Sequence, residues 1–175
     1  MRPLRCRGVC VVKFLFSIAL PLYALDQGTK WWIVKHFELG RDGYTVVPGF
    51  FDLVYWANTG AAFSAFTGNN KFFIGLSLAA FIGLLYFYAK GAFVDRLSKW
   101  GVALLLPGIL GNLTDRLVHN HVVDFLLFDL HVPYAHPWPA FNVADSCICT
   151  ATGLFILGAL KEYRKAPAKA EDSAK

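Results

Sequence analysis

Asp124 and Asp145 are the residues whose type and surroundings point most directly to chemistry. Asp124 lies in the run VVDFLL and Asp145 in FNVADS, so apolar residues flank both carboxyl groups. Burial disfavours a charged carboxyl, and two carboxyls brought close together share one proton, so that one acts as an acid and the other as a base. Such a pair can activate water for attack on an amide. The two aspartates are therefore our candidate catalytic pair.

A second polar cluster lies in the run GNLTDR. Asn112, Asp115 and Arg116 are spaced i, i+3 and i+4, which places them on one face of a helix. A charged side chain inside a membrane segment costs about 2.5 kcal/mol or more, so the cluster requires an explanation. A packing seam of small residues capped by a local ion pair explains it as well as a functional site does.

Three further groups have simple structural interpretations. Asn142, three residues before Asp145, is typical of a helix N-cap followed by an acidic residue in the first turn. Asp26 and Lys30 are one helical turn apart, which favours an ion pair. The segment NTGAAFS, which begins at Asn58, predicts a tight turn with exposed backbone N–H groups.

Membrane-spanning helices are the elements that must position these residues. The chain of 175 residues is 56% hydrophobic and only 17% charged, too little charge to cover a soluble globule. Four apolar stretches of roughly 18 to 20 residues are each long enough to cross about 30 Å of hydrocarbon. They are expected at about Val11 to Thr29, Phe72 to Ala89, Gly101 to Val118 and Phe141 to Leu160.

The distribution of charge predicts the orientation. Twelve of the 17 Lys and Arg residues fall in the two terminal segments and in the loop between the second and third spans. The excess of positive charge places this side, with both ends of the chain, in the cytoplasm. The net charge of +5 is thus a topology signal and gives no reason to expect nucleic-acid binding. A cleaved signal peptide is a weaker interpretation, because Pro21 to Ala24 is a poor cleavage site and cleavage leaves an odd number of spans.

Two segments on the outward side predict strands. Tyr44 to Trp56 is rich in Val, Phe, Tyr and Trp and is broken only by Pro48-Gly49, which favours a hairpin, and Val122 to Val132 is a second β-prone run. We therefore expect an all-α membrane protein with a small β-sheet on its outer face. Residues 1–165 are expected to form a single domain, and residues 166–175 a disordered polar tail.

Taken together, the motifs resemble those of the lipoprotein signal peptidase family, also called signal peptidase II. Five segments carry the resemblance in the family's order: DQGTK from Asp26, NTGAAFS from Asn58, GNLTDR from Gly111, VDF around Asp124 and FNVADS from Phe141. Five motifs in order on a four-span chain are specific, whereas any one of them alone is weak. The chain departs from the family at two positions, where Pro107 replaces a usually small residue and Thr114 an often apolar one.

The resemblance implies an aspartic endopeptidase of the bacterial cytoplasmic (inner) membrane, which removes the signal peptide from prolipoproteins just before a diacylglyceryl-modified cysteine. It assigns catalysis to Asp124 and Asp145. It implies a monomer in contact with membrane lipids, with its site on the periplasmic or extracellular side and with no cofactor or metal. It assigns contact with the substrate to Asn58, Gly60, Asn112, Arg116 and Asn142, and a supporting role to Asp26, Lys30 and Asp115.

Two other classes of function are left open. His119 and His121 with Asp124, and His131 and His136 beyond them, allow a metal site, although their spacing is not that of known zinc hydrolases. Intramembrane charges also mark ion paths, but these clusters gather at one face and the second span carries no charge, which argues against a transporter or channel. Inhibition by a chelator would favour the first class, and substrate flux that survives loss of either aspartate would favour the second.

Overall fold

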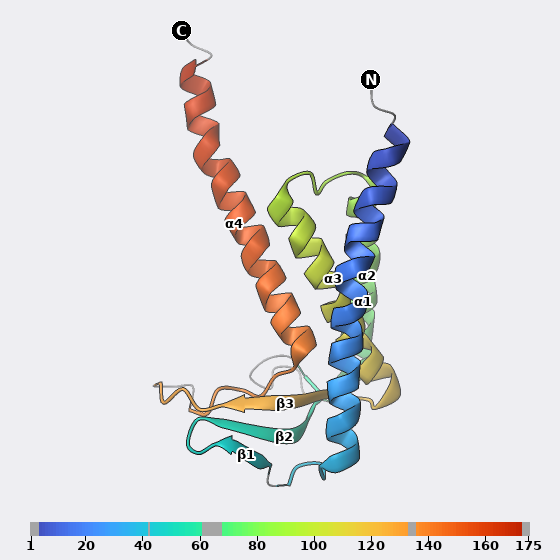
Figure 1. The fold of residues 1–175 in the computed structure, drawn as a ribbon, viewed down its shortest axis with the longest axis vertical. Coiled ribbons are helices and arrows are strands. Elements are labelled where there is room, and N and C mark those ends of the chain that lie inside the picture. The colour runs from blue at the N-terminus through green and yellow to red at the C-terminus, as the bar shows by residue number, and fades with distance from the viewer. Residues whose placement is uncertain (1–3, 42, 61–67, 133–135, 173–175) are drawn as a thin grey trace.

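The structure is a helical bundle with a small sheet at one end (Figure 1). The computed structural model describes residues 4–41, 43–60, 68–132 and 136–172. The elements in chain order are α1 (Leu4–His36), β1 (Tyr44–Val47), β2 (Phe51–Asn58), α2 (Asn70–Ala89), α3 (Arg96–Val118), β3 (Val122–Phe128) and α4 (Val143–Asp172).

Three helices of the described residues are long and apolar enough to cross a membrane: Asn70–Ala89, Arg96–Val118 and Val143–Arg164. Helix α1 is 33 residues long but is not among them, and it carries the charged residues Asp26 and Lys30. The fourth span therefore stays a prediction. Helix α4 also includes residues 166–172, which the sequence assigns to a disordered tail. Ala, Lys and Glu there are strong helix formers, and the domain boundary at residue 165 stays a prediction as well.

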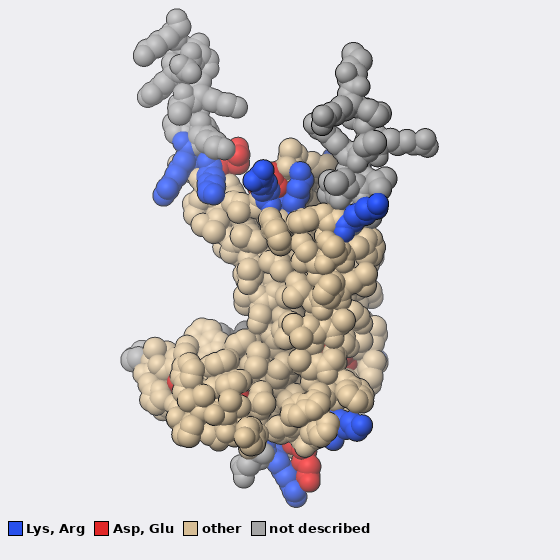
Figure 2. Space-filling model, in the orientation of Figure 1, with Lys and Arg blue, Asp and Glu red and all other residues tan. Residues whose placement is uncertain are grey.

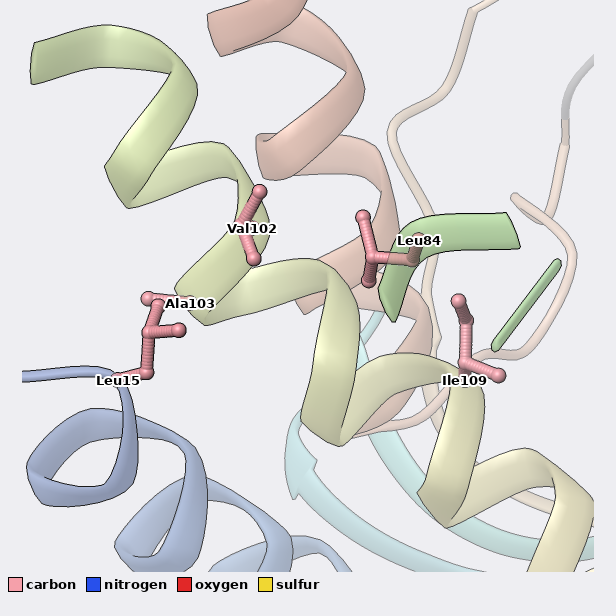
Figure 3. Close-up of a cluster of buried hydrophobic side chains, with 5 residues drawn as sticks. All are labelled: Leu15, Leu84, Val102, Ala103 and Ile109. Atoms are coloured by element: carbon pink, nitrogen blue, oxygen red, sulfur yellow. The ribbon is translucent and has the colours of Figure 1, made fainter. Parts of the chain in front are cut away.

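Helix α3 lies at the centre of the bundle and packs against α1, α2 and α4. One buried cluster joins Leu15 of α1 and Leu84 of α2 to Val102, Ala103 and Ile109 of α3 (Figure 3).

Small residues let α3 approach its neighbours closely. A Cβ atom at Gly108 would lie 2.6 Å from Ile148 Cγ1 and 2.8 Å from the carbonyl oxygen of Ala144, so only glycine fits against α4. The structure thus contains the packing seam that the sequence suggested. Pro107, one of the two departures from the family, lies buried within α3, which continues on both sides of it.

The sheet is three-stranded and antiparallel in the order β1-β2-β3. Pro48 and Gly49 form the turn between β1 and β2, where Gly49 has a left-handed backbone (φ 71°). Both predicted β-segments are confirmed, although β3 ends at Phe128, before Val132. Val123 and Phe125 pack on Ile33 of α1, and because side chains alternate along a strand, Asp124 points away from that face.

Both termini and the α2–α3 connection lie at the end of the bundle away from the sheet (Figure 1). Lys and Arg side chains gather at this end, and a broad uncharged band separates them from the charges near the sheet (Figure 2). This separation of charge fits the expected topology. The assignment of the basic end to the cytoplasm stays a prediction.

Candidate active site

The start of helix α4 positions Asp145. The backbone N–H of Asp145 donates to Asn142 Oδ1 at 2.9 Å, and the N–H of Asn142 donates back to Asp145 Oδ2 at 3.3 Å. This reciprocal cap is the one predicted from the sequence. It holds the half-buried carboxyl in the first helical turn, where the helix dipole favours negative charge.

Strand β3 carries Asp124, whose side chain is almost fully buried at 3% exposure. Its oxygens accept hydrogen bonds from Asn58 Nδ2 at 2.9 Å and from Asn142 Nδ2 at 2.8 Å. Burial raises the pKa of Asp124 to about 7, and the negative charge of Asp145 adds to the rise, while the two amide donors oppose it. Asp124 therefore retains a proton at pH values where an ordinary aspartate is ionised.

Asn142 connects the two aspartates. Its side chain is completely buried and donates to Asp124 Oδ1, while its backbone N–H donates to Asp145 Oδ2. Residues far apart in the sequence, on β3 and α4, thus meet in one polar cluster. A carboxyl of raised pKa beside a second carboxyl at a helix N-terminus is an arrangement suited to acid–base chemistry.

The other predicted substrate-contacting residues border this cluster. Asn112 Nδ2 donates to Asp145 Oδ1 at 2.7 Å. Arg116 Nη2 donates to the carbonyl oxygen of Gly60 at 3.1 Å, and its Nε has no partner among the described residues. The N–H of Gly60 in turn donates to Asn58 Oδ1 at 3.0 Å, which forms the predicted turn. The rest of that motif, residues 61–64, lies outside the described residues.

Behind the cluster lie the three predicted supporting residues. Lys30 Nζ is 2.9 Å from Asp26 Oδ2, as the spacing predicted, and 2.8 Å from Asp115 Oδ2. Asp115 thus pairs with α1, whereas the sequence suggested a local ion pair with Arg116. All three charged side chains are at most 3% exposed. This ion cluster is therefore part of the protein core.

Sequence reasoning overlooked three residues of this region. Gln27 Nε2 donates to Asp26 Oδ2, the carbonyl oxygen of Gly111 and Asp115 Oδ1, at 3.0, 3.2 and 3.1 Å. A polar residue next to Asp26 within an apolar stretch was a signal for it. Asn70 donates to the carbonyl oxygen of Arg116, and Phe73 lies 5.0 Å from the Arg116 guanidinium, but nothing in the sequence around them indicated these contacts.

Thr114, the second departure from the family, has its own partner. Its hydroxyl lies 3.0 Å from the hydroxyl of Tyr23 on α1 and donates to the carbonyl oxygen of Leu110. The polar group is therefore satisfied within the bundle and does not contact either aspartate of the pair.

The histidines do not assemble a metal site in the part of the chain that the structure describes, where no three His, Cys, Asp or Glu side chains are grouped to hold an ion. Asn120 has a left-handed backbone (φ 63°), so His119 and His121 lie on either side of a turn residue and not within a strand. His131 and His136 contact Asp129, outside the polar cluster.

Comparisons with known proteins identify the family of the chain. The family described as signal peptidase (SPase) II matches residues 18–161. A lipoprotein signal peptidase of Syntrophotalea carbinolica is 43% identical over 148 residues, which cover 83% of this chain and 89% of that protein. One of Bacillus pumilus is 38% identical over 152 residues, covering 87% and 96%.

Solved structures give the same result. A bacterial membrane enzyme determined by the in meso method at 2.3 Å resolution has a TM-score of 0.79 and 32% identity, and the match covers 87% of this chain and 90% of that one. The chain therefore belongs to the signal peptidase II family.

Proposed function

We propose that this chain is an aspartic endopeptidase that cleaves the signal peptide from prolipoproteins just before the diacylglyceryl-modified cysteine. One observation carries the proposal: Asp124 and Asp145 lie in one polar cluster joined through Asn142. Curated relatives at 43% and 38% identity are lipoprotein signal peptidases, which supports the choice of substrate.

The environments of the two carboxyls support different roles for them. Asp124, with a pKa raised to about 7, is the acid, and Asp145 at the N-terminus of α4 is the base. Asp145 takes a proton from water, the water oxygen attacks the scissile carbonyl carbon, and Asp124 gives its proton to the carbonyl oxygen. When the C–N bond breaks, the proton held by Asp145 passes to the leaving nitrogen, and Asp124 takes back a proton from a hydroxyl group of the intermediate, which leaves a carboxylic acid and restores the pair. Neither step requires a metal or cofactor.

Arg116 and Gly60 are the proposed substrate contacts on the far side of the cluster. Arg116 is 8% exposed and uses Nη2 on Gly60, which leaves Nε as a donor without a partner among the described residues. A guanidinium group only donates hydrogen bonds, so its unpaired N–H suits a substrate carbonyl oxygen. Asn58, Asn112 and Asn142 orient the carboxyls from the other sides.

The uncharged band of the bundle supports a site that works from within the membrane. The surface is hollowed between α4 and the sheet, and among the described residues no charged side chain is seen in that hollow on the face drawn in Figure 2. We propose that the substrate enters from the lipid on this side while its acyl chains remain in the bilayer. In this proposal the protein is a monomer that crosses the inner membrane four times, with both ends in the cytoplasm and the pair on the outer side.

Separate Asp124→Asn and Asp145→Asn variants test the proposal. Each should lower turnover of a diacylglyceryl-modified prolipoprotein by about 10²- to 10⁴-fold, because each removes one proton-transfer group. Turnover is measured from the shift of the processed lipoprotein on a gel, with purified enzyme in detergent.

Asp129→Asn is the matched control, since Asp129 follows β3 but lies outside the cluster and should retain full turnover. Membrane insertion of all three variants should equal that of the parent chain. Full activity of either Asp124→Asn or Asp145→Asn would reject the aspartic mechanism.

A further inference from the structure

Lys30 uses all three of its ammonium protons within the core. Its Nζ lies 2.9 Å from Asp26 Oδ2, 2.8 Å from Asp115 Oδ2 and 3.1 Å from Asn112 Oδ1. An ammonium group has three donors, so these three acceptors satisfy it completely. Two of the acceptors are ion partners, and the third is the amide that donates to Asp145.

The two carboxylates around Lys30 each hold the chain one residue before a catalytic aspartate. Asp26 Oδ1 accepts a hydrogen bond from the N–H of Ala144 at 2.8 Å, directly before Asp145. Asp115 Oδ2 accepts one from the N–H of Val123 at 3.0 Å, directly before Asp124. Lys30 therefore ties together the two backbone segments that carry the pair.

The contact with Lys30 also fixes the direction of the Asn112 amide. Asn112 Oδ1 accepts hydrogen bonds from Lys30 Nζ and, at 3.3 Å, from Asn142 Nδ2. The NH₂ group of Asn112 is therefore left to donate to Asp145 Oδ1 at 2.7 Å. A flipped amide would place NH₂ against an ammonium group and a carbonyl oxygen against a carboxylate. The flip is thus excluded as long as Lys30 is present.

We propose that Lys30 is a positioning residue that acts through the Asn112 amide to place the negative charge of the Asp124–Asp145 pair on Asp145. This inference rests on the proposed aspartic mechanism and adds the device that makes its two carboxyls unequal. An N–H donor directed at a carboxylate stabilises the ionised form, and with Asp145 ionised the proton remains on Asp124.

The surrounding charges argue for an effect through the amide and not through space alone. The charged groups that face Asp145 are Asp26 and Lys30 from α1, Arg116 from α3, and Asp124 from β3, and Asp115 of α3 pairs with Lys30. Lys30 is bracketed by two carboxylates, so the ion cluster as a whole is not positive. Its influence on Asp145 is therefore directional and depends on which end of the amide it holds.

The test removes the Lys30 contact while the net charge of the ion cluster stays the same. In the double variant Lys30→Met/Asp26→Asn, one positive and one negative charge are lost, and the new amide oxygen can still accept from the N–H of Ala144. The acid limb of the kcat/KM profile for the lipidated prolipoprotein should move up by about one pH unit, with kcat at pH 6 reduced about tenfold.

Gln27→Met is the matched control. It deletes hydrogen bonds to two carboxylates of the same ion cluster and to the carbonyl oxygen of Gly111, but none to Asn112. It should lower the melting temperature and leave the pH profile in place. A double variant that is folded and has the profile of the parent chain would reduce Lys30 to a structural role and overturn the inference.

Asn112→Leu keeps the inference testable where the double variant does not fold. A leucine is close in size to asparagine, so the change leaves Lys30 paired with its two carboxylates and removes the donor that faces Asp145 without adding a charge. A higher acid limb and a lower kcat support the inference, and an unchanged profile contradicts it. Either failure differs from failure of the aspartic mechanism, which would appear as turnover that survives loss of Asp124 or Asp145.

Discussion

Asp124 is held in surroundings that favour its neutral form. Its side chain is buried, a second carboxyl lies in the same cluster, and its two hydrogen-bond donors are neutral amides. Desolvation and like charge therefore outweigh the amides, and the pKa rises to about 7. The same features that suit an acid in catalysis should make the folded protein sensitive to pH.

The thermal stability of the parent chain should fall as the pH rises from about 4 to about 8. The pKa of Asp124 is 3.8 as a free side chain and about 7 in the folded protein. In this window the folded state holds a proton that the unfolded state releases, so the free energy of unfolding decreases by at most about 4 kcal/mol as the pH rises.

Asp124→Asn has no proton to lose and should be free of this decrease. Melting temperatures of both chains in one detergent, measured at half-unit steps of pH, provide the comparison. The two curves should converge toward low pH, apart from a constant offset from the altered hydrogen bonds. Parallel curves over the whole range would show that Asp124 ionises normally.

At the scale of single elements, local sequence patterns were sufficient to predict contacts between residues that are close together in the chain. The Asn142–Asp145 cap, the Asp26–Lys30 pair and the hairpin at Pro48-Gly49 were all predicted because each depends on residues within a few positions of one another. The pairing of Asp115 with Lys30 was not, because it requires knowing which face of α1 packs on α3.

The contact of α3 with α1 and α4 should depend on the absence of a side chain at Gly111. A Cβ atom there would overlap Asp26 Oδ2 and lie 3.0 Å from Ala144 Cβ. Gly111→Ala should therefore push α1 and α4 away from α3, lower stability by about 1–3 kcal/mol and reduce turnover. Melting temperature and prolipoprotein cleavage by the same preparation measure both effects.

Gly153→Ala on α4 provides the comparison, since no atom lies within 4 Å of a Cβ at that position. It should match the parent chain in both assays. Equal behaviour of the two alanine variants would contradict the tight approach of α1 and α4 to Gly111.

At the scale of the whole molecule, the ends of the bundle differ in charge and in content. The basic end holds both termini and the α2–α3 connection, and the opposite end holds the sheet and the polar cluster (Figures 1 and 2). Three helices have the length and composition of membrane spans, whereas α1 carries the buried ion pair of Asp26 and Lys30 in the half nearer the sheet. Because these charges are satisfied by α3, they do not prevent α1 from crossing.

Labelling with a membrane-impermeant maleimide tests this topology. Single cysteines introduced at Lys13 and Lys90 should react only from the cytoplasmic side, and those at Arg41 and Asp129 only from the outside, in a chain whose four native cysteines are replaced by serine. Lys13 and Arg41 flank the apolar part of α1, so reaction of both from one side would mean that α1 does not cross. Prolipoprotein cleavage by each single-cysteine variant, assayed before labelling, verifies that the chain is folded. None of these four positions contacts the polar cluster, so each variant should remain active.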